Sequence, residues 1–154
     1  MTLTRTECLL LLLYAPGANA KEGEKIVGMT KLQKLLFLLG KEGRLENILP
    51  DYFKHIAYKF GPFSQELLDE LELLKELKLI QDFGLIVEEG EGQTFELTER
   101  GLEVARKIVK ETPKDILKKV INIKTVYGSQ PTNQLLRYVY LKYPEYAVYS
   151  EAKL

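Results

Sequence analysis

The sequence predicts a mainly α-helical fold with one short β-hairpin. Leucines recur at helical spacing, most clearly over residues 32–39. Two strand-like runs, 85–89 and 93–97, flank a glycine-bearing link at residues 90–92. The chain has 154 residues, of which 45% are hydrophobic and 29% charged. Those values are typical of a globular domain that is large enough for one hydrophobic core.

The first helix is expected over residues 5–14. Thr4 and Glu7 match a Thr-x-x-Glu capping box, in which each side chain bonds the backbone N–H of the other residue. Arg5, the apolar run 8–15 and Ala18-Asn19-Ala20 together also imitate a secretory signal with its cleavage site. The apolar run is short for that role and too short to span a bilayer. We therefore expect a buried helix, a cytoplasmic location and no membrane partner.

A second helix is predicted to begin at Thr30, with Gln33 completing a second capping box. Its leucines share one face, while its lysines fall mostly elsewhere. Residues 45–50 are interpreted as a connector, and 51–58 as a short helix or irregular segment. Gly61-Pro62 then breaks the chain, because proline sets one backbone dihedral and glycine permits unusual ones.

Ser64 is placed to cap a third helix that continues to about Leu79. The predicted hairpin of 85–89 and 93–97 follows, and Thr98 is placed to cap the helix after it. Together these elements have the order of a winged-helix domain. An unrelated small α+β domain is the alternative.

Two more helices are expected at the C-terminal end. Thr112-Pro113 is placed to cap the first, with proline at its preferred first position. The second covers 132–143 and is ended by Pro144. We divide the chain into a winged-helix-like domain, 1–112, and a C-terminal helical extension, 113–154, packed on it as one compact unit.

Two segments are similar to a known family. Lys31-Leu-Gln-Lys-Leu-Leu-Phe37, followed by Tyr58-Lys-Phe-Gly-Pro-Phe-Ser64, resembles the Panacea domain of SocA-like antitoxins and the YwgA-like group of prokaryotic proteins. The motif positions, expected to serve the core and the turn, are Thr30, Leu32, Lys34, Leu35, Tyr58, Gly61, Pro62, Phe63 and Ser64. The resemblance implies a small, mostly helical domain without enzymatic activity, which in the antitoxin members acts by binding partner proteins.

Charge is balanced in total, at 22 Lys and Arg against 22 Asp and Glu, but it is unevenly placed. Residues 61–99 hold 2 Lys or Arg against 11 Asp or Glu, and residues 100–154 hold 11 against 5. The third helix of a winged-helix reader enters the major groove, where phosphate contacts require cations. Here that helix carries a set of carboxylates that we interpret as a protein-partner surface or a solvated face: Glu66, Asp69, Glu72 and Glu76.

A DNA-binding regulator that uses its basic helices in a dimer is the alternative function. The candidate nucleic-acid surface consists of Lys31, Lys34, Lys59, Arg106, Lys107, Lys110, Lys114, Lys118 and Lys119. Solvated lysines are the simpler interpretation of the same residues. The charge asymmetry also favours a homodimer, as do six tyrosines of residues 127–149, since tyrosine is enriched at interfaces. Core packing is an equal alternative for these tyrosines.

No catalytic, metal or cofactor site is expected. His55 is the only histidine and Cys8 the only cysteine, so no His/Cys set for zinc exists and no motif supports a nucleophile–histidine pair. Residues 90–92 lack the Lys-Ser/Thr that follows in a phosphate loop. We expect a non-enzymatic regulatory module that acts by protein–protein contact, antitoxin-like or regulator-like. Abundant Lys and Glu with few Asn, Gln and Cys is typical of thermophile proteins.

Overall fold

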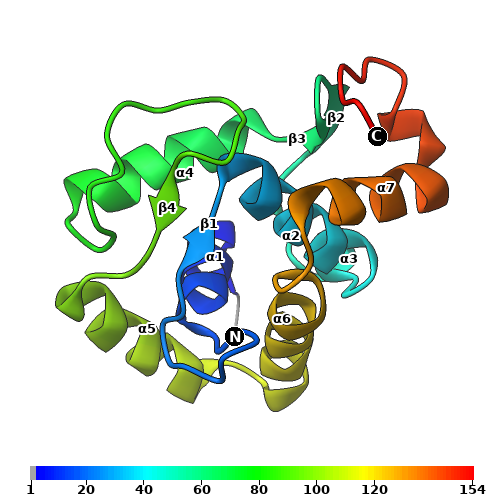
Figure 1. Ribbon diagram of the computed structural model, residues 1–154. Coiled ribbons are helices and arrows are strands. Elements are labelled where there is room, and N and C mark those ends of the chain that lie inside the picture. The colour runs from blue at the N-terminus through cyan, green and yellow to red at the C-terminus, as the bar shows by residue number, and fades with distance from the viewer. Residues whose placement is uncertain (1–2) are drawn as a thin grey trace.

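The computed structural model describes residues 3–154 as a mainly helical fold with two small antiparallel sheets (Figure 1). The first elements are α1 (Arg5–Tyr14), β1 (Ile26–Val27) and α2 (Met29–Lys41), followed further along the chain by α4 (Gln65–Glu76) and β4 (Thr94–Phe95). Between α2 and α4 lie α3 (Leu45–Ile48), β2 (Ile56–Tyr58) and β3 (Gly61–Phe63). The chain ends with α5 (Glu99–Glu111), α6 (Lys114–Tyr127), α7 (Thr132–Lys142) and the 3-10 turn η1 (Pro144–Tyr146).

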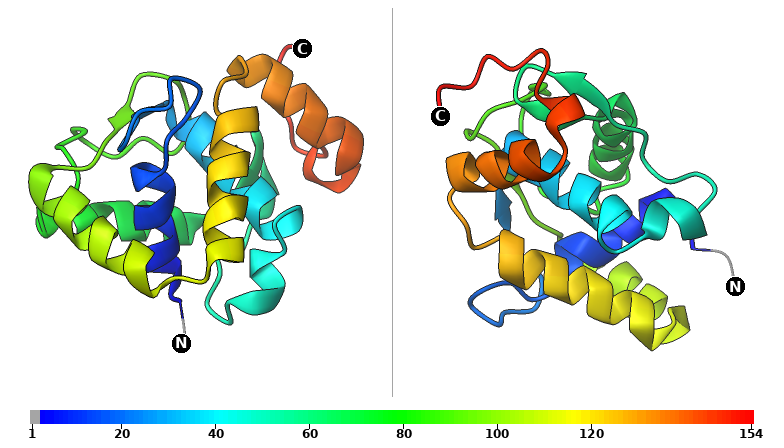
Figure 2. Two further views of the ribbon diagram at one scale, coloured as in Figure 1. Left: turned by 90° about the horizontal axis from the view of Figure 1, so that it is seen from below. Right: turned by 90° about the vertical axis from the view of Figure 1, so that its right-hand side faces the viewer.

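The helices α1 and α2 form the centre of one hydrophobic core. Residues 8–13 of α1 are all buried, and α2 is buried from Leu32 to Gly40. α5 and α6 pack on α1, and α6 and α7 pack on α2 (Figures 1 and 2). The C-terminal helices add Val120 and Val139 to the same core. Burying leucines on all sides leaves polar residues of α2 in the interior, where each needs a partner.

Two predicted caps are confirmed. Thr4 accepts a hydrogen bond from the backbone N–H of Glu7, whose carboxylate accepts one from the N–H of Thr4 at 3.0 Å. Thr98 accepts from the N–H of Gly101 at 3.1 Å. In both pairs the partners are three residues apart in sequence, so the bonding is decided locally.

The predicted cap of α2 is wrong, because α2 begins after Gly28 and includes Thr30. The Thr30 hydroxyl instead accepts a hydrogen bond from the backbone N–H of Gly90 at 2.8 Å. Gln33, the expected partner in the capping box, bonds the backbone of Ser64. Tertiary contacts have taken both polar groups that the local pattern assigns to the helix end.

Two further capping interpretations need correction. Ser64 stands at the N-cap of α4, but its side chain makes no capping hydrogen bond. Thr112 donates its hydroxyl to the carbonyl of Ile108 at 2.7 Å, so that Pro113 and not Thr112 is the N-cap of α6. A buried threonine at a helix end can satisfy its hydroxyl on the preceding turn.

The predicted hairpin of 85–89 and 93–97 does not form. β4 pairs with β1, with Ile26 opposite Phe95, and Leu97 bridges to Ile80 on the other side. We call residues 82–93 the wing; they contain no strand and arch along α4 (Figure 1). The strand propensity of the β-branched run finds no pairing partner there, and Leu85 is 89% exposed.

A hairpin forms instead at residues 56–63, where the sequence predicts a short helix or irregular segment and then a turn. β2 pairs with β3, with Ala57 opposite Pro62. Gly61-Pro62 therefore lies in a strand, and the turn itself is at Lys59 and Phe60. The expected connector at 45–50 contains the single helical turn α3.

Candidate functional site

The two motif segments meet in the interior. Gln33 of α2 is fully buried and holds the chain between β3 and α4 with two hydrogen bonds. Its amide donates to the carbonyl of Ser64 at 3.0 Å and accepts from the N–H of Ser64 at 2.9 Å. A buried amide that bonds both groups of one residue fixes the start of α4 relative to α2. The motif is therefore a structural joint.

Lys34, the next residue of the motif, is also buried, with 1% of its side chain exposed. Its ammonium donates to the carbonyl of Pro62 at 3.0 Å and lies 3.8 Å from a carboxylate oxygen of Glu89. Burial lowers the pKa of Lys34 to about 7, and Glu89 opposes that shift. A buried residue contacts no phosphate backbone, so the prediction that Lys34 belongs to a nucleic-acid surface is wrong.

Glu89 comes from the wing, and its side chain is 6% exposed. Burial raises the pKa of this carboxyl group, and Lys34 opposes that shift. The two residues that flank Glu89 in sequence also form hydrogen bonds that hold this part of the wing in place. Gly90 exchanges two hydrogen bonds with Thr30, and Glu88 accepts one from the Tyr58 hydroxyl at 2.9 Å. We call these residues, together with Lys34 and Glu89, the wing latch.

Gly61 allows this close approach of α2 and β3. Its φ is +86°, in the region that favours glycine. A Cβ atom there would lie 2.8 Å from Cδ1 of Leu136 and 3.0 Å from Cε of Lys34. The glycine of the motif is required by both backbone conformation and space, whereas the sequence indicates only a turn.

The outer face of α4 is acidic and apolar. Its inward face buries Leu67, Leu68, Leu71 and Leu74. Among the outward residues, Leu73 and Leu77 are 43% and 46% exposed. The carboxylates that stand around these two leucines are Asp69, Glu72 and Glu76, of which Asp69 and Glu76 are exposed and Glu72 half-buried.

The fourth predicted carboxylate of this surface, Glu66, is engaged within the molecule. It accepts from the guanidinium of Arg5 at 3.0 Å and from the backbone N–H of Lys54 at 2.7 Å. Glu70, on the same side, is buried and accepts from the Thr6 hydroxyl. These two residues attach α4 to α1 and are less available to a partner.

The wing continues the α4 face. Lys75 turns toward the wing and donates to the carbonyl of Gly84 at 2.7 Å, with its ammonium 4.7 Å from the centre of the Phe83 ring. Residues 61–99 contain only two lysines, and one of them, Lys75, is thus bonded within the molecule. Beyond it the wing exposes Leu85, Ile86 and Val87 at 89%, 36% and 48%.

The basic candidates are dispersed. Lys31 is half-buried and donates to the carbonyl of Gly128 at 3.1 Å, and Arg106 pairs with Glu22 at 2.6 Å. Lys119 is half-buried and Lys59 lies exposed in the β2–β3 turn. The exposed lysines on the consecutive helices α5 and α6 are Lys107, Lys110, Lys114 and Lys118.

The tyrosines of the C-terminal segment pack mostly on the core. Tyr127, Tyr138, Tyr143 and Tyr146 contact it, and the hydroxyls of Tyr127 and Tyr138 donate to Glu42. The sequence left core and interface as equal alternatives. The core holds these four, and a fifth, Tyr149, is 69% exposed.

Burial shifts the pKa values of both the cysteine and the histidine. Cys8 is fully buried, which raises the pKa of its thiol to about 12. Burial, with Lys34 nearby, lowers the pKa of His55 to about 3. Within residues 3–154 no group of three or more His, Cys, Asp or Glu is placed to hold a metal ion. No helix in that range is long and apolar enough to cross a membrane.

No protein-family model and no curated protein sequence matches this chain. The similarity to the Panacea domain therefore depends on the two motifs, and family membership stays a prediction. What the structure adds is the joint that the motifs build, together with the face of α4 and the wing that this joint holds in place.

Proposed function

We propose that the chain is a non-enzymatic binding module that acts by protein–protein contact through α4 and the wing. One observation carries this proposal: two exposed leucines, Leu73 and Leu77, stand among carboxylates on the helix that a winged-helix reader inserts into DNA. Carboxylates repel the phosphates of DNA. Exposed leucines gain no favourable contact in a groove that is lined by phosphates. An apolar centre with a charged rim is the ordinary composition of a protein interface.

The partner class follows from the same face. A complementary protein surface would place apolar side chains on Leu73 and Leu77 and cations opposite Asp69, Glu72 and Glu76. The wing latch supports this function by fixing the wing, with its exposed Leu85, beside α4. The resemblance to antitoxins favours the same mode of action, either antitoxin-like or regulator-like.

Affinity capture from the source cell, followed by binding measurements with the purified partner, tests the proposal. Leu73→Ser combined with Leu77→Ser should weaken partner binding by about tenfold or more, since each removes a central apolar contact. Leu141→Ser is the matched control, because Leu141 is 85% exposed on α7. Equal binding by the double variant, or recovery of nucleic acid alone, contradicts the proposal.

A DNA-binding regulator that uses basic helices in a dimer is the second candidate. The exposed lysines of consecutive α5 and α6 favour it, because cations on neighbouring helices can follow one phosphate backbone. Fluorescence anisotropy with duplex DNA at several salt concentrations separates the two functions. A steep decrease of DNA affinity with salt concentration supports DNA binding if it becomes shallower in the quadruple variant Lys107→Gln, Lys110→Gln, Lys114→Gln and Lys118→Gln. The absence of binding at low salt excludes this function.

The charge asymmetry also supports a homodimer, in which the α4 face of each copy meets α5 and α6 of the other. Such a dimer would be strongest at low ionic strength, because salt screens exposed charges. Light scattering coupled to size exclusion measures the mass directly. A monomer at high protein concentration in low salt is the result that rejects it.

A further inference from the structure

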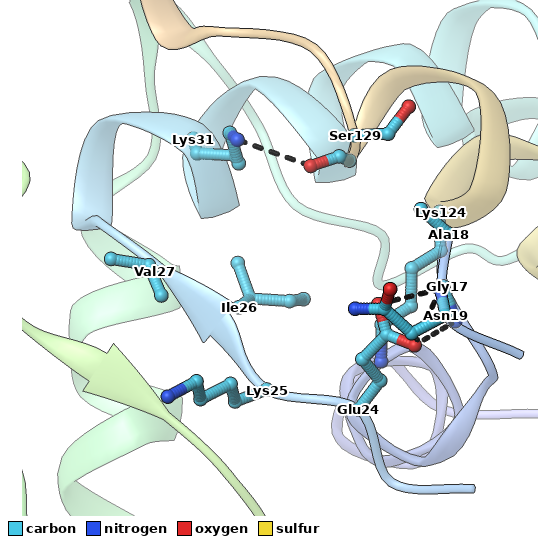
Figure 3. A pocket seen from close by; sticks show the side chains of 11 residues that line it. Gly17, Ala18, Asn19, Glu24, Lys25, Ile26, Val27, Lys31, Lys124 and Ser129 are labelled. Carbon is cyan, nitrogen blue, oxygen red and sulfur yellow. Dashed lines mark hydrogen bonds between the residues drawn. The ribbon is translucent and has the colours of Figure 1, made fainter. Parts of the chain in front are cut away.

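A pocket of about 280 Å³ lies between the loop after α1, strand β1, the first turn of α2 and the last turn of α6 (Figure 3). We call it the loop pocket. Its charged lining residues are Lys25, Lys31, Lys124 and Glu24. The volume is close to that of the smaller ligand sites in proteins, about 300 Å³. No residue of α4 or the wing lines it.

Lys124 is the unusual member of this set. It comes from α6, and 2% of the residue is exposed. Its ammonium donates to the carbonyl of Leu13, near the end of α1, at 3.2 Å. An ammonium has three N–H donors, and this is its one hydrogen bond within residues 3–154. Burying a cation with donors to spare is costly unless a further acceptor satisfies them.

Glu24 does not supply that acceptor. Its carboxylate accepts from the backbone N–H groups of Gly17 and Asn19 at 3.2 and 3.1 Å (Figure 3). It also accepts from the backbone N–H of Lys21 at 3.4 Å. The loop therefore orients Glu24 and satisfies much of its charge. Burial lowers the pKa of Lys124 to about 7, and Glu24 only partly opposes that shift.

Lys31 faces the same space from the first turn of α2. It donates to the carbonyl of Gly128 at 3.1 Å, the bond drawn in Figure 3, and burial lowers the pKa of its ammonium too. Lys25 is exposed at the rim. The ammonium groups of Lys31 and Lys124 thus stand against one lining carboxylate, which is already bonded to backbone amides.

We propose that the loop pocket binds a small organic oxyanion, a carboxylate or phosphate ester that also carries a hydroxyl group. The anionic group would accept hydrogen bonds from Lys124 and Lys31, and the hydroxyl would donate to Glu24. An anion alone would meet the Glu24 carboxylate without compensation. A ligand that combines an acceptor with a donor satisfies both signs of charge in the wall.

A purely structural role for the two lysines makes different predictions. Each ammonium bonds a carbonyl at the C-terminal end of a helix, a position where cations are favourable without any ligand. In that case no small anion would bind. Binding would also take up no protons, whereas an anion bound beside Lys124 restores its charge and draws a proton from the buffer.

The test titrates the full chain with glycolate and with glycerol phosphate, which separate the carboxylate and phosphate-ester sources, and with chloride as the control ion. We expect one of the two organic anions to give saturable NMR shifts at the amides of Asn19, Lys31 and Gly128. Calorimetry at pH 8 in two buffers of different ionisation enthalpy should show proton uptake. Lys124→Met should weaken binding by about tenfold or more.

Lys118→Met is the matched control, since Lys118 is an exposed lysine on the same helix; it should leave binding unchanged. Lys31→Gln should weaken anion binding by a smaller factor than Lys124→Met. It replaces Lys124→Met as the test variant if that protein does not fold. The proposal is overturned if neither organic anion gives a saturable shift, if chloride shifts the same amides equally, or if a folded Lys124→Met variant binds as tightly as the wild type.

Discussion

The two buried lysines of this chain have similar pKa values but different surroundings. Lys34 lies between α2 and β3, bonded to the Pro62 carbonyl and 3.8 Å from the buried carboxylate of Glu89. Lys124 bonds the Leu13 carbonyl and borders a pocket, where the nearby carboxylate of Glu24 is held by backbone amides. Burial lowers the pKa of each ammonium to about 7.

The difference concerns what each lysine leaves behind when it is removed. Without Lys34, Glu89 is a buried carboxylate that has lost its principal cation and keeps only the weaker influence of Lys59. Without Lys124, Glu24 keeps its hydrogen bonds to the loop. We therefore interpret Lys34 as part of the fold, because it holds the wing, and Lys124 as a group that the fold tolerates beside the loop pocket.

The largest expected effect tests this contrast directly. Lys34→Met should destabilise the protein by about 3 kcal/mol at pH 7, because breaking a buried pair leaves an uncompensated charge. Lys124→Met should be neutral or stabilising, because it removes a buried ammonium and leaves no unpaired carboxylate. Denaturant unfolding of the two variants measures both. Adding Glu89→Gln to Lys34→Met should recover most of the loss; equal losses in the two single variants would remove the contrast.

The second effect is a pH dependence that belongs to Lys124. Its pKa is about 7 in the folded protein and near its ordinary value, 10.5, in the unfolded chain. Between those values the unfolded chain binds more protons, so stability rises with pH; below pH 7 both states are protonated and the cost is fully present. The wild type should gain about 2 kcal/mol relative to Lys124→Met between pH 7 and pH 9.

Unfolding free energies of the wild type and Lys124→Met at pH 7, 8 and 9 give this difference. Cys8, whose pKa burial raises, lowers the stability of both proteins at high pH and therefore cancels in this difference. Parallel curves for the two proteins would mean that Lys124 is charged and well solvated in the folded state.

The third effect concerns the packing around Lys34. Gly61→Ala should cost more than Gly90→Ala by about 1.5 kcal/mol, measured by thermal or denaturant unfolding. Both glycines have positive φ, at +86° and +124°, so both variants strain the backbone. Only Gly61 also has Leu136 and Lys34 within contact of an added Cβ, and Gly90 has nothing within 4 Å. Equal costs would indicate that Lys34 and Leu136 move aside freely.

The smallest effect is expected on α4, where the carboxylates are exposed. Changing Asp69, Glu72 and Glu76 to Gln should alter stability by no more than about 0.5 kcal/mol per site. Adding Glu66→Gln should cost more, because Glu66 bonds Arg5 and the backbone of Lys54. The triple variant should bind its protein partner more weakly and DNA no less than before. Loss of DNA binding would mean that α4 reads DNA.

Local patterns predicted the elements that local bonding decides. The limits of α1, the cap at Thr98 and the last helix ending before Pro144 agree with the structure. Each depends on hydrogen bonds or steric limits within a few residues of the chain. The leucines of α4 recur at helical spacing, and four of them, Leu67, Leu68, Leu71 and Leu74, share the buried face in the structure.

The wing was mispredicted because strand propensity requires a partner strand. Residues 85–89 have the composition of a strand, but β4 pairs with β1, which comes from a segment more than sixty residues earlier. Nothing in the sequence near the wing indicates that β1 takes the place of residues 85–89 as the partner of β4. The same is true of Glu89: a glutamate in an acidic, glycine-bearing segment is typical of a solvated loop, yet it is buried against Lys34.

The chain's own pattern was sufficient to predict a mainly helical fold, because helix periods and helix caps act over short distances. The roles of Thr30, Gln33 and Lys34 depended on folding, which brings α2, β3 and the wing together and buries polar groups that must then find partners. The loop pocket arises in the same way, from α1, β1, α2 and α6. Contacts between residues distant in sequence decide which lysine becomes structural and which borders an open space.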